Sequence, residues 1–256
     1  MELALFALWC FVVAAAGGVA GLVLGNIRLP ATLLVTSSAA AGGGANLLIS
    51  AAAAGAASVS HIRAGNVNWH LFAWMAPPSV AGAVLGGYLA GLIDEDVLLV
   101  CIAVVLLYSG IDLLRWRPRV APAGEPAARE PGGREFNRPA AVLGGAVIGV
   151  LGGLVGLILG TLRMPALLRF VGEPVRRAVG TNLTVGVCVG IAGALGHLPS
   201  VAPDWRIAAV GAAASIPGAV IGARLTGRLS ELQLLHAIGA ILLVAATAMA
   251  LKAILA

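Results

Sequence analysis

The sequence predicts an all-α integral membrane protein built from two homologous tandem repeats. Three observations lead to this class: the composition, a series of apolar stretches of membrane-spanning length, and a motif that occurs twice. Hydrophobic residues make up 60% of the 256 residues, and charged residues only 11%. Soluble domains carry about 25% charged residues, so this chain has too little charge to cover a surface in water.

Six apolar stretches are each long enough to cross a bilayer as a helix, which takes roughly 20 residues. They are residues 3–24, 70–92, 97–114, 139–159, 207–225 and 232–251. Two longer apolar tracts, 29–60 and 164–195, are interrupted by glycine and polar residues. The first stretch follows Met1-Glu2 without a basic region, so we expect a retained helix instead of a cleaved signal peptide.

The duplication rests on a first block and four later matches that recur in the same order. Residues 21–31 read GLVLGNIRLPA, and residues 156–166 read GLILGTLRMPA, an offset of 135. Every later match has an offset of 136. These matches are 44–47 (GANL) with 180–183 (GTNL), His61 with His197, 68–69 (NW) with 204–205 (DW), and 82–93 (GAVLGGYLAGLI) with 218–229 (GAVIGARLTGRL).

The repeats divide the chain into residues 1–114, a hydrophilic linker at 115–138, and residues 139–256. The linker reads RWRPRVAPAGEPAAREPGGREFNR and holds six of the sixteen Lys and Arg residues. Positive loops stay in the cytoplasm, so we expect the linker there. The net charge of +5 therefore reports membrane topology and not a nucleic-acid partner.

Pro30 and Pro165 are the predicted helix breaks, because proline disfavours helix at the residue before it and suits the first turn of a new helix. Two topologies are open. If the tract 29–60 crosses once, each half has four spans and the halves run parallel. If it returns as a hairpin, with 42–44 (GGG) at its tip, each half has three spans and the halves are inverted. We favour inverted repeats with a broken or re-entrant helix pair, a common transporter plan.

With a cytoplasmic linker, either scheme puts the arginines of the second tract on the outer side unless they are buried. These are Arg163, Arg169, Arg176 and Arg177.

Arg28 and Arg163 are the first candidates for substrate binding, since a charge near the hydrocarbon is costly and usually functional. A guanidinium beside a helix N-terminus favours an anion. The alternative is an arginine that reaches to lipid headgroups. Asn46, Thr181 and Asn182 are hydrogen-bond donors for an oxyanion or, alternatively, groups that cap or join helices.

His61 and His197 are candidates for gating or proton-linked roles, or else ordinary polar-turn residues. The predicted spans have no Asp or Glu near their centres, and the sequence contains no P-loop, HExxH, GxSxG or metal-spaced His/Cys cluster. We therefore expect no enzyme activity, no metal and no cofactor.

Residues 176–197 (RRAVGTNLTVGVCVGIAGALGH), followed by 204–205 (DW) and 218–225 (GAVIGARL), resemble the sulfite exporter TauE/SafE family of 4-toluene sulfonate uptake permease type membrane transporters. The resemblance covers nearly the whole chain and implies a duplicated helical protein of the bacterial inner membrane. It also implies that Gly44, Gly180, Thr181, Asn182 and the two proline breaks help to form the anion path. The family's glycine run before the proline is replaced here by LVLGNIR and LILGTLR, each with an added arginine.

The expected function is secondary transport of a small inorganic or organic sulfur oxyanion, such as sulfite or an organosulfonate. Export is favoured, because an anion leaves a negative interior without a coupling ion. A passive anion channel and a non-transporting membrane scaffold are the alternatives. The exact substrate, the coupling ion and a homodimeric state stay open.

Overall fold

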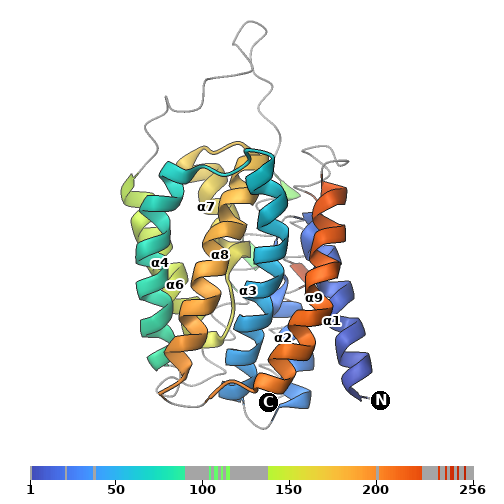
Figure 1. Ribbon diagram of the computed structural model, residues 1–256. Helices are drawn as coiled ribbons and strands as arrows, with labels where there is room; N and C mark the ends of the chain where they lie inside the picture. Colours follow the sequence, from blue (N-terminus) through green and yellow to red (C-terminus); the bar gives the residue numbers. More distant parts are fainter. Residues whose placement is uncertain are drawn as a thin grey trace, which may run out of the picture.

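The structure is a computed structural model that describes residues 2–20, 22–36, 39–89, 138–199 and 202–226, with isolated positions between 104 and 115 and between 236 and 251. Within these ranges all regular secondary structure is helical (Figure 1). The elements are α1 Glu2–Ala20, α2 Gly25–Val35, α3 Ala39–Arg63, α4 Trp69–Leu89, α6 Arg138–Val155, α7 Gly160–Ala166, the π-helix η1 Leu167–Val171, α8 Val175–His197 and α9 Trp205–Thr226. The predicted spans 97–114 and 232–251, and most of the linker, lie outside the described residues.

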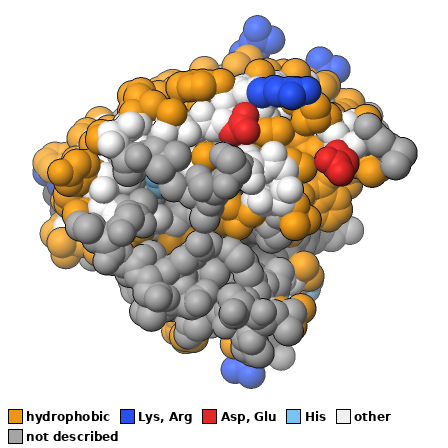
Figure 2. Space-filling model, turned by 90° about the horizontal axis from the view of Figure 1, so that it is seen from below, with side chains coloured by type: hydrophobic (Ala, Val, Ile, Leu, Met, Phe, Trp, Pro, Cys, Tyr) orange, Lys and Arg blue, Asp and Glu red, His pale blue; other side chains and the backbone are white. Residues whose placement is uncertain are grey.

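The chain is a multi-pass membrane protein. Five of the described helices, α1, α3, α6, α8 and α9, are long and apolar enough to cross a membrane. Their outer surfaces are apolar: large side chains such as Leu5, Leu143 and Ile191 are exposed. Seen from the end where α1 begins, the described side chains around the rim of the bundle are mainly hydrophobic (Figure 2). Such a surface suits lipid and not water.

Helices α3 and α8 cross at the centre of the bundle and run antiparallel, while α1 runs parallel to α9 and α4 parallel to α6 (Figure 1). The contacts that give these directions are Leu47 with Gly190, Ala54 with Gly186, Phe11 with Gly218, Ala15 with Gly222, Ala146 with Gly82 and Val150 with Gly86. Most of these close approaches bring a glycine against the backbone of the facing helix, as in other tightly packed membrane helices.

These directions define two ends of the bundle. Helices α1 and α9 begin at one end, which we term the α1 end, and α6 and α8 begin at the other, the α6 end (Figure 1). The N–H of Asp204, just before α9, bonds to the carbonyl of Ala41 in the first turn of α3, so α3 also begins at the α1 end. Asn68, just before α4, bonds to Glu173, just before α8, which places both at the α6 end.

The predicted breaks at Pro30 and Pro165 are wrong by several residues. Pro30 lies inside α2 and Pro165 inside α7, and the chain instead breaks at 21–24 and 156–159. In both breaks a leucine N–H bonds back five residues, Leu22 to Gly17 and Leu157 to Gly152, each at 2.8 Å. Each proline removes only one backbone hydrogen-bond donor from a short helix. A chain reversal is a larger perturbation of the backbone, and the glycines near each break permit it.

The glycine run 42–44 is not a hairpin tip, since α3 continues through it. These glycines instead admit neighbouring segments. A Cβ on Gly44 would lie 2.9 Å from Cγ of Pro203, and one on Gly43 would lie 3.4 Å from Cα of Gly156. Their small size is therefore explained by close packing.

Contrary to the prediction from the sequence, Arg176 and Arg177 do not lie on the side of the membrane opposite the linker. They stand in the first turn of α8, at the α6 end, where Arg138 starts α6 and stacks 5.3 Å over the ring of Trp74 in α4. The physical reason is the reversal at 156–159: after it, α7 and η1 lead the chain back to the end where α6 began (Figure 1).

Candidate anion-binding site

Arg28 and Arg163 are among the most deeply buried side chains, with exposed fractions of 1% and 0%. Arg28 follows the first break in α2, and Arg163 follows the second in α7. Burial at this depth excludes the alternative of arginines that reach to lipid headgroups in this structure. A buried charge is tolerated only when it is paired or hydrogen-bonded, so each guanidinium needs acceptors nearby.

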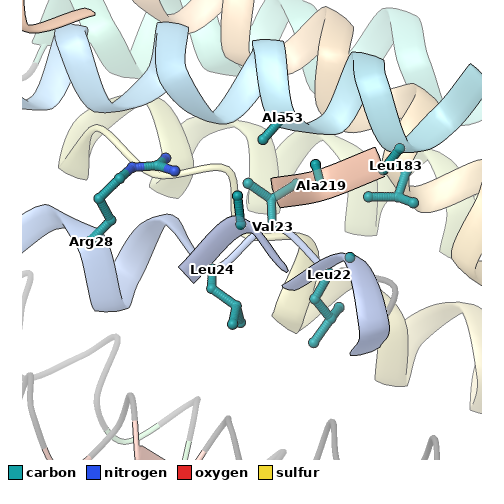
Figure 3. Close-up of a pocket in the computed structure, with 10 residues that line it drawn as sticks. Leu22, Val23, Leu24, Arg28, Ala53, Leu183 and Ala219 are labelled. Atoms are coloured by element: carbon teal, nitrogen blue, oxygen red, sulfur yellow. The ribbon is translucent and has the colours of Figure 1, made fainter. Parts of the chain in front are cut away.

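Arg28 points from α2 toward α3 (Figure 3). Its Nε donates to Oδ1 of Asn46 at 3.0 Å, and its Nη2 donates to the backbone oxygen of Asn46 at 3.3 Å and to Oγ of Ser50. All three acceptors lie on one turn of α3. The guanidinium therefore joins the first hairpin, which consists of α1, the break at 21–24 and α2, to the central helix α3.

Arg163 makes fewer contacts. Its Nη1 donates to Oδ1 of Asn182 at 3.2 Å. Its Nε and Nη2 are buried and have no hydrogen-bond partner among the described residues. Buried donors without acceptors are rare in native proteins and call for an explanation.

Asn46 and Asn182, which we predicted to donate hydrogen bonds to a substrate, instead bond to backbone carbonyls at or next to the two breaks. Asn46 Nδ2 donates to the carbonyls of Gly25 (3.2 Å) and Gly156 (3.1 Å), so it contacts both breaks and uses both of its N–H groups. Asn182 Nδ2 donates to the carbonyl of Gly160 at 3.2 Å. The structure thus brings each predicted arginine together with the asparagine of its own half.

Thr181, Gly44 and Gly180 contact loops instead of a guanidinium. Thr181 Oγ1 accepts the N–H of Asn68 at 2.9 Å. Gly180 lies against the backbone carbonyl of Asn66 with no room for a Cβ. Thr181 and Gly180 thus contact the connection between α3 and α4, whereas Gly44 lies against Pro203 in the connection between α8 and α9.

His61 and His197 are buried at the C-terminal ends of α3 and α8. His197 Nε2 lies 3.0 Å from the carbonyl oxygen of Gly153, three residues before the turn at Gly156. It therefore contacts the second hairpin, which consists of α6, the break at 156–159 and α7. Nε2 of His61 has no hydrogen-bond partner within the described part of the chain.

A cavity of about 10 Å³ lies beside Arg28, between the first break and helices α1, α3, α8 and α9 (Figure 3). This volume holds about one water molecule, less than an oxyanion needs. The structure is therefore closed around Arg28 and leaves no room for an oxyanion there.

The two ends of the bundle differ in charge. The described charged side chains at the α6 end, apart from Glu173, are basic, whereas the α1 end carries two acidic residues and one basic residue. The basic ones are Arg63, Arg138, Arg176, Arg177 and Arg224, and those at the α1 end are Glu2, Asp204 and Arg206. No group of three or more His, Cys, Asp or Glu side chains among the described residues is placed to hold a metal ion.

Ser50 is the contact that sequence reasoning missed. It lies one helical turn after Asn46 on the same face of α3, so the spacing of two polar residues in an apolar tract is a usable signal. The corresponding residue of the second half is Gly186, at the offset of 136.

Comparison with protein-family models finds one described as "Sulfite exporter TauE/SafE", which matches residues 6–249. No curated protein matches this chain, and no solved structure does.

Proposed function

The chain belongs to the sulfite exporter TauE/SafE family, and we propose that it is a secondary transporter that exports a small sulfur oxyanion, sulfite or an organosulfonate, across the bacterial inner membrane. The observation that carries the proposal is the pair of fully buried guanidinium groups, each one turn after a helix break. No carboxylate among the described residues bonds to either one. The opposing charge is then supplied by the anion that passes.

Matched contacts support two inverted repeats as the transport framework. The α1–α9 and α4–α6 pairs exchange when the halves exchange, and so do α3–α9 and α8–α4. The bond from Leu22 to Gly17 has its counterpart from Leu157 to Gly152 at the same distance. Corresponding helices run in opposite directions, as inverted repeats require (Figure 1). Helix α1 leads into its break from the α1 end, and α6 leads into its break from the α6 end. Alternating access works by moving one such repeat against the other.

Charge supports export. Positive residues gather at the α6 end, which the positive-inside rule assigns to the cytoplasm. A basic entrance raises the local concentration of anions. Outward movement down the membrane potential gains about 2.3 kcal/mol per unit charge per 100 mV, so export needs no coupling ion.

Flux measured in liposomes tests the proposal. We expect wild-type protein to move labelled sulfite and to show saturable counterflow, which a passive channel does not give. The double variant Arg28→Ala/Arg163→Ala should lose the flux, while Arg206→Ala should keep it, since Arg206 is an exposed arginine at the start of α9 and lies outside the basic α6 end. Wild-type flux in the double variant would rule out the arginine site, and no flux of any sulfur oxyanion in wild type would rule out the function.

A further inference from the structure

We propose that the two arginines have different roles: Arg163 holds the anion with its Nε and Nη2 atoms, and Arg28 holds the first hairpin in place. This assignment rests on the proposed function and deepens it, since it predicts one anion per chain at a site that the duplication would suggest is double. The chemical class of the ligand is an oxyanion that presents two oxygens on one face.

Nε and Nη2 form one edge of the guanidinium. These two donors point the same way and match two oxygens of one anion in a bidentate arrangement. In Arg28 this edge is occupied from within the protein, by Oδ1 and the backbone oxygen of Asn46 and by Oγ of Ser50. An anion can reach this edge only by displacing α3.

In Arg163 the same two atoms, Nε and Nη2, are the ones without a partner among the described residues. Its one bond, to Asn182, uses the remaining nitrogen, Nη1, and turns the guanidinium so that the bidentate edge faces away from that amide. The side chain is fully buried, so a donor pair left without acceptors there costs free energy unless a ligand accepts from it.

The sequence difference behind this asymmetry lies at one position. Ser50 supplies an acceptor to Arg28, and its counterpart Gly186 has no side chain to offer Arg163. A Cβ on Gly186 would meet only Ile158 and Ala54 within 4 Å, both apolar. Ile158 belongs to the second break, so α8 offers apolar packing at Gly186 and no acceptor for Nε and Nη2 of Arg163.

Binding to the purified full-length chain in detergent tests the assignment. With sulfite as the probe in isothermal titration calorimetry, we expect one anion per chain. Arg163→Lys should weaken binding by at least roughly tenfold, because an ammonium cannot make the bidentate pair. Arg28→Lys should weaken binding less than Arg163→Lys, and Arg224→Lys should leave it unchanged. Two anions per chain, or a larger loss from Arg28→Lys than from Arg163→Lys, would overturn the assignment.

Thermal unfolding without sulfite gives a second readout that does not depend on binding. Arg28→Met leaves the acceptors of Asn46 and Ser50 without a donor and should lower the Tm. Arg163→Met removes a buried charge with two unpaired nitrogens and should leave the Tm unchanged or raise it. Equal losses of Tm in the two variants would contradict the assignment.

The same experiments separate failure of this inference from failure of the proposed function. If the wild type binds and transports sulfite but depends on Arg28 more than on Arg163, only the division of roles fails. If the wild type neither binds nor transports any sulfur oxyanion, both fail.

Discussion

Burial of Arg28 is stabilised by acceptors that the local helix provides. A guanidinium removed from water costs several kcal/mol unless each of its donors finds an acceptor. Asn46 meets much of this need alone, because its side-chain oxygen and its backbone oxygen both accept from Arg28. Its amide nitrogen then binds the carbonyls of Gly25 and Gly156, so one residue links the arginine to both breaks.

Ser50→Ala is expected to destabilise the protein by about 1–3 kcal/mol, because Nη2 of Arg28 loses an acceptor in a buried site. Ser58→Ala in the same helix is the matched control, since the bond that Ser58 makes among the described residues is to the carbonyl of Gly55 within α3. Unfolding in increasing SDS measures both free energies. An effect of Ser50→Ala no larger than that of Ser58→Ala would contradict the role given to Ser50.

The residues that could be predicted from the sequence are those that the two halves share. Arg28 and Arg163, with Asn46 and Asn182, recur at the repeat offset, and each pair meets in the structure. Ser50 could not be found in this way, because a comparison of the halves discards a position where they differ. That difference from Gly186 is what distinguishes the two guanidinium groups.

At the scale of elements, the two hairpins show why the predicted positions of the breaks are wrong. The proline rule describes local backbone preference, and it points to the residue before Pro30 and Pro165. The chain reverses earlier, at 21–24 and 156–159, where glycines and apolar residues allow the segment to pass between helices. Packing against α3 decides this position, and one half of the sequence alone does not reveal it.

Gly156 turns the second hairpin with a φ of +73°, and a Cβ there would lie 2.5 Å from Cα of Gly43. We expect Gly156→Ala to cost clearly more than the roughly 1–2 kcal/mol of a left-handed alanine, because α3 must also move away. Sulfite flux should fall with it, since the turn carries α7 and Arg163.

Gly65 provides the control for this substitution. It has a φ of +69° in the loop after α3, and no atom lies within 4 Å of its Cβ position. Gly65→Ala should therefore show the backbone cost alone, with flux retained. Equal destabilisation of the two variants in SDS unfolding would mean that the contact with Gly43 is unimportant.

At the scale of the whole molecule, the fold class was predictable because composition and hydropathy act over the entire chain. Multi-pass membrane structure follows from the five long apolar helices, and family membership agrees with it. The places of Arg176 and Arg177 were not predictable, because the number of chain reversals before α8 decides on which side they stand. One undetected reversal moves every later loop to the other side of the membrane.

Accessibility of single cysteines in bacterial spheroplasts tests the inverted arrangement. The background is a chain with its three native cysteines replaced by alanine. Ala64, in the α3–α4 loop at the α6 end, and Ala202, in the α8–α9 loop at the α1 end, are both exposed.

We expect a membrane-impermeant maleimide to label Ala202→Cys in intact spheroplasts, and Ala64→Cys only after permeabilisation. The reason is that, in the proposed inverted arrangement, the two loops occupy corresponding places in halves of opposite direction, with the basic α6 end inside. Labelling of both cysteines from the same side would contradict inversion. Labelling of Ala64→Cys alone in intact spheroplasts would keep inversion and reverse the orientation, placing the basic entrance outside and making uptake, not export, the direction that the charges favour.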